Sequence, residues 1–374
     1  MRSRGDHPDV SSFPSKNILV GWFGFMRDLL STEKTCFLHP ATDPHQWHLT
    51  DAACKGDRQS PINIVTRNVV YDKSLKPLTF EGYDGKGSSK WNVENNGHTV
   101  KVTLDASPKV GGGGLARKYK AVEFHLHWGV PSLQQSSPGV QQYIPGSEHS
   151  IDGEKYAMEL HLVHIREDVS NVAEAKKYKD GLAVLAFFIK VDEENKNYAA
   201  LLNELENIQY KGKKDTCNRG FTSCATWEVH GGIRLRINVD KTCSHKCYRQ
   251  YFPVVCSGLS AQMDPLPLSS LLPPKEELGR YYRYEGSLTT PDCFEGVIWT
   301  IFEMPIELSL PQLSQFAALH FDGKNSTHMI ENFRPIQPLN ERKVSWSSAS
   351  IVLPPAKLLL LLLTLTYFLS SPSQ

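Results

Sequence analysis

The chain has 374 residues, of which 40% are hydrophobic, and its 16 Phe, 14 Tyr and 7 Trp are ample for a sizeable globular core. Lys and Arg together number 41 against 40 Asp and Glu, so the chain is nearly neutral. This balance excludes the strongly basic composition that is typical of nucleic-acid-binding proteins. Eight cysteines in a chain of this length do not indicate a disulfide scaffold. Whether they lie in an oxidising or a reducing compartment has to be inferred from other features of the sequence.

The first 43 residues give no clear targeting signal. Residues 1–14 are polar, and residues 18–26 form a short apolar run behind Lys16 without a clear small-residue cleavage site. An ordinary buried segment is the alternative interpretation of this run. We favour an incorrectly assigned start of the chain, and treat residues 1–43 as an uncertain segment outside the fold prediction.

Residues 44–342 are expected to form one sheet-dominated domain. Short β-branched and aromatic runs alternate with Gly, Pro, Asn and Asp, as at residues 99–104, 159–164 and 182–188. Helical periodicity is scarce, and residues 198–208 are the clearest helix candidate. The pattern predicts a mostly β (α+β) fold.

The segment Glu-Phe-His-Leu-His-Trp-Gly, which begins at Glu123, alternates polar and apolar residues as a half-buried β-strand does. Its alternation places Glu123, His125 and His127 on one face and Phe124 and the other apolar residues on the opposite face. Two imidazoles so placed can reach one metal ion. A pair of partly buried, hydrogen-bonded histidines is the alternative.

A third histidine, His161, follows Glu159 in a second strand-like run. Three neutral imidazoles from two neighbouring strands would make a tetrahedral zinc (Zn2+) site with its fourth position open, which is typical of catalytic zinc. Each ligand needs an acceptor for its second ring N–H, and Glu123 and Glu159 are the candidates.

The end of the chain has the pattern of a GPI-attachment signal. Small residues at 347–350 are followed by a spacer to Lys357, and an apolar run of 12 residues then extends from Leu358 to Leu369. That run is shorter than the roughly 20 residues that span a bilayer. We predict that residues 343–374 carry this signal, with attachment at Ser348 or next at Ser347. A tail anchor or a buried C-terminal helix is the alternative.

A further feature that fits secretion is the N-glycosylation sequon at Asn325, which lies in a polar, loop-like stretch. Sequons of this length are common by chance. Glycosylation of Asn325 is therefore an expectation that supports secretion without deciding it.

Seven short motifs occur in the order and approximate spacing found in α-type carbonic anhydrases, and the resemblance covers about residues 47–342. They are Ser60-Pro61-Ile62-Asn63-Ile64, Asn95-Asn96-Gly97-His98, Glu123 to Gly129, Ser147-Glu148-His149, Glu159 to His164, Ser287-Leu288-Thr289-Thr290-Pro291 and Phe333-Arg334-Pro335. The resemblance implies a single domain around a large, twisted, mainly antiparallel central β-sheet with a few short surface helices.

The same resemblance implies zinc on His125, His127 and His161, activating water to attack CO2. Carbonic anhydrases are themselves the standard example of zinc lowering the pKa of bound water. Thr289 would accept from the zinc-bound hydroxide and donate to the buried Glu148, although a Thr–Glu hydrogen bond can also be purely structural.

Two further roles follow from the resemblance. His98 matches the proton shuttle, for which an imidazole pKa near neutrality is suited, although an exposed loop histidine is the alternative. Substrate-binding candidates are Val163, Val184, Leu288, Thr290, Val297 and Trp299. Each of the apolar ones reads equally well as core without the resemblance.

Cys54 and Cys293, together with the GPI-like tail, resemble the membrane-anchored extracellular members of the family, in which cysteines at matching positions form a disulfide. A free thiol pair is the alternative. The resemblance therefore implies CO2 hydration at the extracellular face of the cell membrane, with bicarbonate transporters as candidate partners. A catalytically silent carbonic-anhydrase-like domain used for binding or adhesion is the rival function.

The sequence departs from the family in three places. Glu123 stands where many members carry Gln, and its carboxylate should raise the pKa of the zinc-bound water. The family's His-Trp-x-Tyr segment is not evident upstream. Residues 215–262 form an apparent insertion with five cysteines: Cys217, Cys224, Cys243, Cys247 and Cys256.

This insertion has three interpretations. Cys243-x-x-x-Cys247 could contribute to a second zinc site, although the other spacings fit no strong ligand pattern. Disulfides could staple the loop and leave one cysteine for Cys36 or unpaired. Retained non-coding sequence is at least as good an interpretation, because long structureless loops are uncommon inside compact domains.

Overall fold

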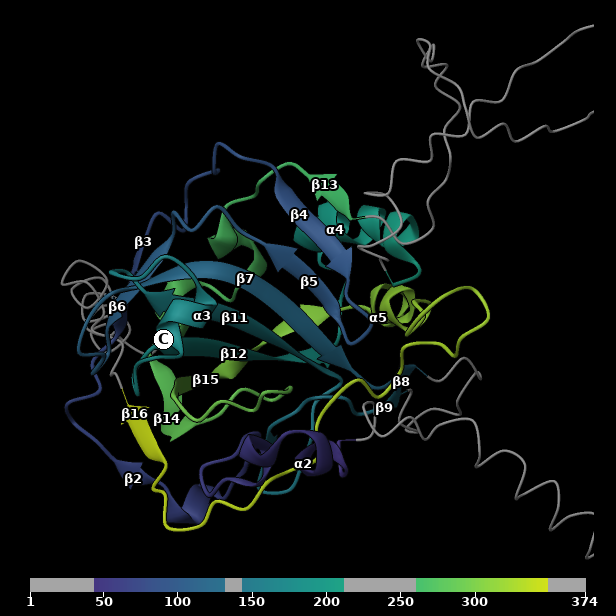
Figure 1. The fold of residues 1–374 in the computed structure, drawn as a ribbon. Coiled ribbons are helices and arrows are strands. Elements are labelled where there is room, and N and C mark those ends of the chain that lie inside the picture. Colours follow the sequence, from purple (N-terminus) through teal and green to yellow (C-terminus); the bar gives the residue numbers. More distant parts are fainter. Residues whose placement is uncertain (1–43, 132–142, 212–259, 349–374) are drawn as a thin grey trace, which may run out of the picture.

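The structure is a computed structural model that describes residues 44–131, 143–211 and 260–348 (Figure 1). A large twisted β-sheet runs through this part of the chain, and the helices around it are short, which confirms the expected fold class. The predictions for residues 1–43, for Cys36, for the five cysteines of the insertion and for the chain beyond Ser348 fall outside the described residues.

The sheet has twelve strands, in the order β13–β4–β5–β7–β11–β12–β15–β14–β16–β2, with β6 pairing with β7 and β3 pairing with β6. Neighbours are antiparallel except for β12 with β15 and β16 with β2. The strands are β2 (Val70–Tyr71), β3 (Leu78–Glu81), β4 (Trp91–Asn95), β5 (Val100–Thr103), β6 (Lys109–Gly112), β7 (Tyr119–Trp128), β11 (Met158–Arg166), β12 (Leu182–Val191), β13 (Ala261–Met263), β14 (Arg280–Gly286), β15 (Val297–Leu308) and β16 (Ser345–Ser348). Two small sheets pair β1 (Asn63–Ile64) with β10 (Ser150–Ile151) and β8 (Val130–Pro131) with β9 (Tyr143–Ile144).

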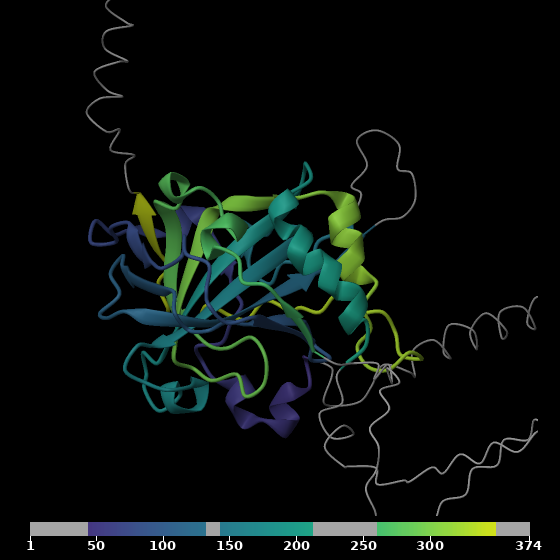
Figure 2. The same ribbon diagram turned by 90° about the horizontal axis from the view of Figure 1, so that it is seen from above.

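The described helices lie outside the sheet, with α4 and α5 side by side along one edge (Figure 2). The α-helices are α2 (Trp47–Thr50), α3 (Val172–Ala175), α4 (Ala199–Glu204) and α5 (Leu310–Ala317), and the 3-10 helices are η1 (Ala52–Lys55), η2 (Thr66–Asn68), η3 (Lys196–Tyr198), η4 (Leu205–Ile208), η5 (Leu268–Leu271) and η6 (Lys275–Glu277). The helix predicted at 198–208 is present as η3, α4 and η4 in succession. Helix α5 begins with a capping box formed by Ser309 and Gln312, which satisfies amide groups at its first turn.

Apolar side chains pack on both faces of the sheet, which makes its central strands rigid supports for a site. The predicted core positions Phe124, Leu126 and Trp128 are buried in one cluster, where the stacked pair Phe187 and Phe302 has ring centroids 4.6 Å apart. A second cluster covers the other face. Every residue of β11 is buried, since both of its faces and both of its edges are covered.

The sheet extends past both boundaries that the sequence suggested. Strand β16 continues it beyond the expected domain end at 342, and the buried Ser347 hydroxyl donates to the carbonyl of Leu75 at 2.9 Å. Strand β13 includes Gln262, the expected last residue of the insertion, and pairs with β4. GPI attachment at Ser348 stays a prediction; the backbone of Ser348 is paired with Arg280 in the sheet.

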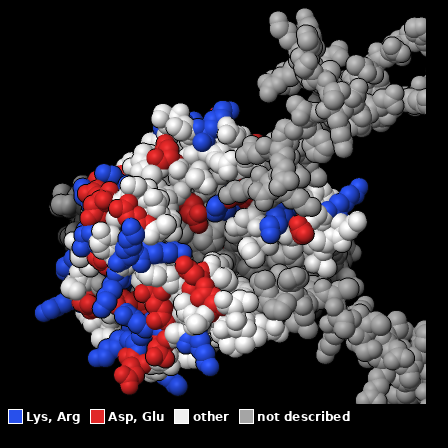
Figure 3. Space-filling model, viewed as in Figure 1, with Lys and Arg blue, Asp and Glu red and all other residues white. Residues whose placement is uncertain are grey.

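Lys, Arg, Asp and Glu are interspersed on the face viewed in Figure 3, as expected for a chain with nearly equal numbers of both signs. None of the described helices is long and apolar enough to cross a membrane.

Candidate metal centre and active site

Three histidines meet where strands β7 and β11 pair. His125 and His127 come from β7, and His161 of β11 lies directly opposite His125 in the antiparallel register. Their candidate ligand nitrogens all lie within 4.8 Å of one another, and Nδ1 of His161 is 3.3 Å from Nε2 of His125. The structure therefore brings together the three residues that the sequence predicted as metal ligands.

Each imidazole of this triad has its second ring nitrogen against a protein oxygen. Nε2 of His161 lies 2.7 Å from Glu159, and Nδ1 of His125 lies 3.3 Å from Glu123. Nδ1 of His127 lies 2.8 Å from the backbone carbonyl of Asn332. These contacts fix the ring orientations and leave Nε2 of His125, Nε2 of His127 and Nδ1 of His161 facing a common point.

The buried histidines are held neutral, as metal ligands must be. Burial, together with the neighbouring histidines, holds the pKa of His127 well below its usual range, and burial lowers the pKa of His161 to about 4. Burial by itself would raise the pKa of Glu159, but His149 and His161 hold that pKa well below its ordinary value. Burial also opposes ionisation of Glu123, yet its contact with His125 and the nearby Lys101 lower the pKa of its carboxyl group.

An unpaired buried nitrogen supports a metal ion at the centre of the triad. Nε2 of His127 is buried and has no hydrogen-bond partner among the described residues. A buried polar atom without a partner is costly, and a metal bond to this lone pair would remove that cost. Three imidazole nitrogens with open space on one side fit zinc with a free fourth position.

Glu148 lies fully buried beside the triad. The backbone N–H of Arg334 donates to its Oε1 at 2.7 Å, while its Oε2 is 3.4 Å from Nε2 of His127. Burial raises the pKa of the Glu148 carboxyl to about 8, and the neighbouring Arg334 amide and Thr289 hydroxyl partly oppose this shift. Thr289 and Glu148 line the same cavity, and a hydrogen bond from the Thr289 hydroxyl to Glu148 stays a prediction.

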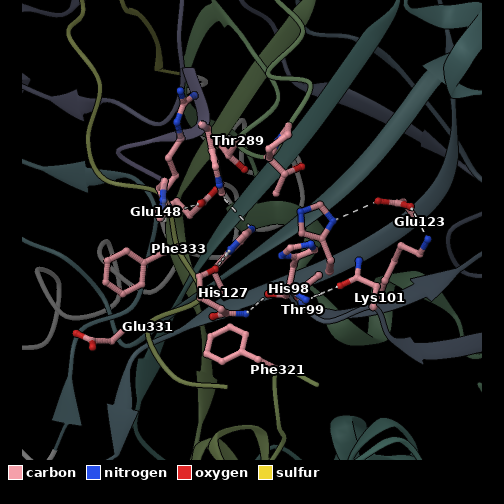
Figure 4. Close-up of a pocket in the computed structure, with 18 of the residues that line it drawn as sticks. His98, Thr99, Lys101, Glu123, His127, Glu148, Thr289, Phe321, Glu331 and Phe333 are labelled. Carbon is pink, nitrogen blue, oxygen red and sulfur yellow. Dashed lines mark hydrogen bonds and ion pairs between the residues drawn. The ribbon is translucent and has the colours of Figure 1, made fainter. Parts of the chain in front are cut away.

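A cavity of about 490 Å³ opens onto two members of the triad, His125 and His127. His98, Lys101, Glu123, Glu148 and Thr289 point into it in Figure 4, and Thr290 also lines it. His98 is exposed at its mouth. Partial desolvation and, second, the positive charge of Lys211 lower the pKa of His98 from its ordinary value.

The predicted apolar wall is a single packed group next to His161. Val163 lies opposite Val184, and Val184 lies opposite Trp299, in the registers of β11, β12 and β15. Val297 is buried in the same cluster, and Leu288 packs against it. The Trp299 ring centroid is 4.8 Å from that of His161, so this apolar group adjoins the triad, although none of its residues is among those that line the cavity.

Comparison with known proteins decides the family. The family described as eukaryotic-type carbonic anhydrase matches residues 42–226 and 241–348. The chain belongs to the carbonic anhydrase family. It is 36% identical over 309 residues to carbonic anhydrase 4 of Rattus norvegicus, covering 82% of this chain and 80% of the relative. It is 34% identical to carbonic anhydrase 15 of Mus musculus, covering 84% and 82%, and 30% identical to carbonic anhydrase 12 of Homo sapiens, covering 82% and 71%.

The predicted disulfide of this carbonic anhydrase is formed between Cys54 and Cys293, which are 239 residues apart. It joins the segment after α2 to the loop that carries Thr289 and Thr290, and the Cys293 amide donates to the carbonyl of Thr290 at 2.8 Å. The predicted sequon residue Asn325 is exposed in a turn, and its glycosylation stays a prediction.

Three residues of this carbonic anhydrase site had no assigned role from sequence. Asn332 holds His127 through its carbonyl and donates from its side chain to the carbonyl of His98 at 3.0 Å. Arg334 supports Glu148 through its backbone. His149 connects Glu159 at 2.7 Å to the Tyr284 hydroxyl at 2.7 Å.

Two of these three could have been suspected, since His149 and Arg334 stand within the motifs that carried the resemblance. Asn332 lies just outside them, and its main role is played by a backbone atom. No side-chain pattern marks such a role in the sequence.

Proposed function

We propose that this carbonic anhydrase catalyses the reversible hydration of CO2 to bicarbonate and a proton, with zinc held by His125, His127 and His161. The convergence of three imidazole nitrogens, one of them buried and without a hydrogen bond, on a point beside Glu148 carries this proposal. Zinc bound there would supply a water of lowered pKa that attacks CO2 near neutral pH.

The residues around the triad would orient the reactants. Glu148, held by the Arg334 amide, would accept a hydrogen bond from the Thr289 hydroxyl, so that the Thr289 oxygen is left to accept from the attacking water. This arrangement fixes the direction of a lone pair rather than transferring a proton, and accelerates the reaction by orientation.

Substrate and proton would use different parts of the site. CO2 is apolar, so the wall of Val163, Val184, Val297 and Trp299 would hold it next to His161. His98, exposed at the cavity mouth, would receive the released proton and pass it to buffer.

Metal analysis and stopped-flow CO2 hydration on the purified full-length protein test this proposal. We expect one zinc per chain and hydration well above the buffer rate. His161→Ala should lose tight zinc binding, because it removes one of three ligands. His164→Gln is the matched control on the same strand, since His164 packs against Tyr83 on the opposite face.

Zinc-loaded protein with no activity above buffer would favour the rival function, a binding or adhesion domain. Full zinc occupancy in His161→Ala would contradict the ligand assignment.

We further propose that the enzyme works at the extracellular membrane surface on a GPI anchor, near bicarbonate transporters. The small-residue, spacer and apolar tail pattern and the likeness to carbonic anhydrases 4 and 15 support this location. Phosphatidylinositol-specific phospholipase C should release the enzyme from intact cells, and retention after treatment would contradict the anchor.

A further inference from the structure

The Glu123 carboxylate touches two groups, one with each oxygen. Its Oε1 lies 3.3 Å from Nδ1 of His125, and its Oε2 lies 3.8 Å from Nζ of Lys101. The same Nζ lies 2.6 Å from Oε1 of Glu94. Glu94, Lys101 and Glu123 form a carboxylate–lysine–carboxylate chain that ends on a metal ligand.

Strand pairing explains why these side chains meet. Glu94 of β4 lies opposite Lys101 of β5, and Lys101 lies opposite His125 of β7. Glu123 is two residues before His125 and shares its face. Figure 4 shows Lys101 and Glu123 side by side at the cavity wall, with the lysine nitrogen directed toward the carboxylate.

The three side chains are only 20–26% exposed, so water screens their charges less than it screens ordinary surface pairs. Without the Lys101 cation between them, the negative charges of Glu94 and Glu123 would repel each other. Glu123 would then relieve the repulsion by turning away from His125. A neutral Gln in place of Glu123 would face no such repulsion.

We propose that Lys101 is a positioning residue, whose ammonium group holds the Glu123 carboxylate against His125 and thereby slows loss of the metal from the triad. The inference rests on the proposed zinc site. Lys101 and Glu123 then act as one functional unit, because the positive charge of Lys101 compensates the negative charge that Glu123 brings next to the metal centre.

Zinc transfer from the full-length protein to a chromogenic chelator at constant pH tests the proposal without relying on activity. Lys101→Met should accelerate zinc loss on the order of 10-fold, the lower end of the effect of removing a partner of a metal-binding histidine. Lys101→Arg should restore a rate close to the wild type, because it keeps the cation. Lys101→Gln repeats the test with a polar side chain if Lys101→Met folds poorly.

Two double variants separate positioning from a general structural effect. In the Glu123→Gln background, Lys101→Met should change the rate little, because no carboxylate remains to be held. Combining Lys101→Met with Glu94→Gln should recover most of the wild-type rate, because the repelling partner is gone. Lys190→Met is the matched control: Lys190 also bridges two carboxylates, Asp192 at 2.7 Å and Glu307 at 2.9 Å, and is not among the residues that line the cavity.

An unchanged rate in Lys101→Met, or the same acceleration with and without the Glu123 carboxylate, would overturn the proposal. A wild-type protein that takes up no zinc would overturn the proposed function as well. Zinc-loaded, active wild type with an unaffected Lys101→Met would overturn this inference alone.

Discussion

At the scale of single residues, the triad uses its ring nitrogens in two ways. His125 and His127 face the centre with Nε2, whereas His161 faces it with Nδ1 because Glu159 holds its Nε2 at 2.7 Å. Each imidazole thus has one nitrogen fixed by the protein and one free for a metal.

The exposed His98 should affect only the step in which the product proton leaves the site, and not the interconversion of CO2 and bicarbonate. We predict that His98→Ala lowers turnover in weak buffer on the order of 10- to 100-fold, because the product proton loses its acceptor at the cavity mouth. Added imidazole should restore turnover, and isotope exchange between CO2 and bicarbonate at equilibrium should stay unchanged. An equal loss in exchange would argue against a proton-transfer role.

Lys211 should set the acid limit of that proton transfer. His98 accepts a proton only in its neutral form, so proton-limited turnover falls as the pH drops through the His98 pKa. Partial desolvation and the charge of Lys211 lower this pKa, which extends turnover to more acidic pH. We predict that Lys211→Gln moves the midpoint of the pH–turnover curve upward.

The exposed Lys275 provides the matched control for this shift, since Lys275→Gln removes the same charge at a different pocket. A midpoint that moves equally in both variants would show a general charge effect rather than an effect on His98.

At the scale of elements, strand alternation was sufficient to place each ligand on the correct face of its own strand. The period of two in β7 and β11 predicted which residues share the metal-facing side, because successive side chains of a strand point to opposite faces. The pairing of β7 with β11, which places His161 opposite His125, came from the family resemblance and not from the pattern.

The ends of the sheet could not be predicted in this way. Strand β16 is rich in serine, and β13 adjoins the apparent insertion, so neither has a strong apolar alternation. Their places depend on partners far away in sequence, such as β14 for β16 and β4 for β13. Local pattern contains no information about such partners.

The disulfide should be the main covalent support of the segment before β1. We predict that replacing both Cys54 and Cys293 with Ser lowers the free energy of unfolding by about 2–5 kcal/mol, because the cross-link closes a long loop in the unfolded chain. The linked segment also offers the Cys54 carbonyl to Arg334 at 3.0 Å. Urea denaturation measures the change.

Cys54→Ser alone is the internal check on that prediction, since one substitution already breaks the bond. A single variant as stable as the wild type would contradict a stabilising role for the cross-link.

At the scale of the whole molecule, the fold buries a set of titratable groups in the middle of its sheet and directly beside it. Glu148, Glu159, His161 and His164 are all at most 1% exposed. Those on the metal-facing side serve the site, whereas His164 lies on the opposite face, where Nε2 is 2.5 Å from the Tyr83 hydroxyl and Nδ1 is 3.0 Å from the Leu162 carbonyl. His164 therefore bears on stability rather than on the site.

Burial lowers the pKa of His164 to about 4 in the folded protein, against about 6.5 for an unfolded histidine. Between these values the unfolded chain binds a proton that the folded chain does not, so the free energy of unfolding falls as the pH falls from about 6.5 to about 4. We predict that His164→Gln removes about 1.4 kcal/mol per pH unit from this slope, because Gln does not titrate. Urea denaturation of the variant and the wild type at several pH values measures this difference in slope. The contribution of the metal ligands is the same in both proteins and cancels in the comparison. The exposed His48 is the matched control, and parallel curves for His164→Gln and wild type would contradict the assignment.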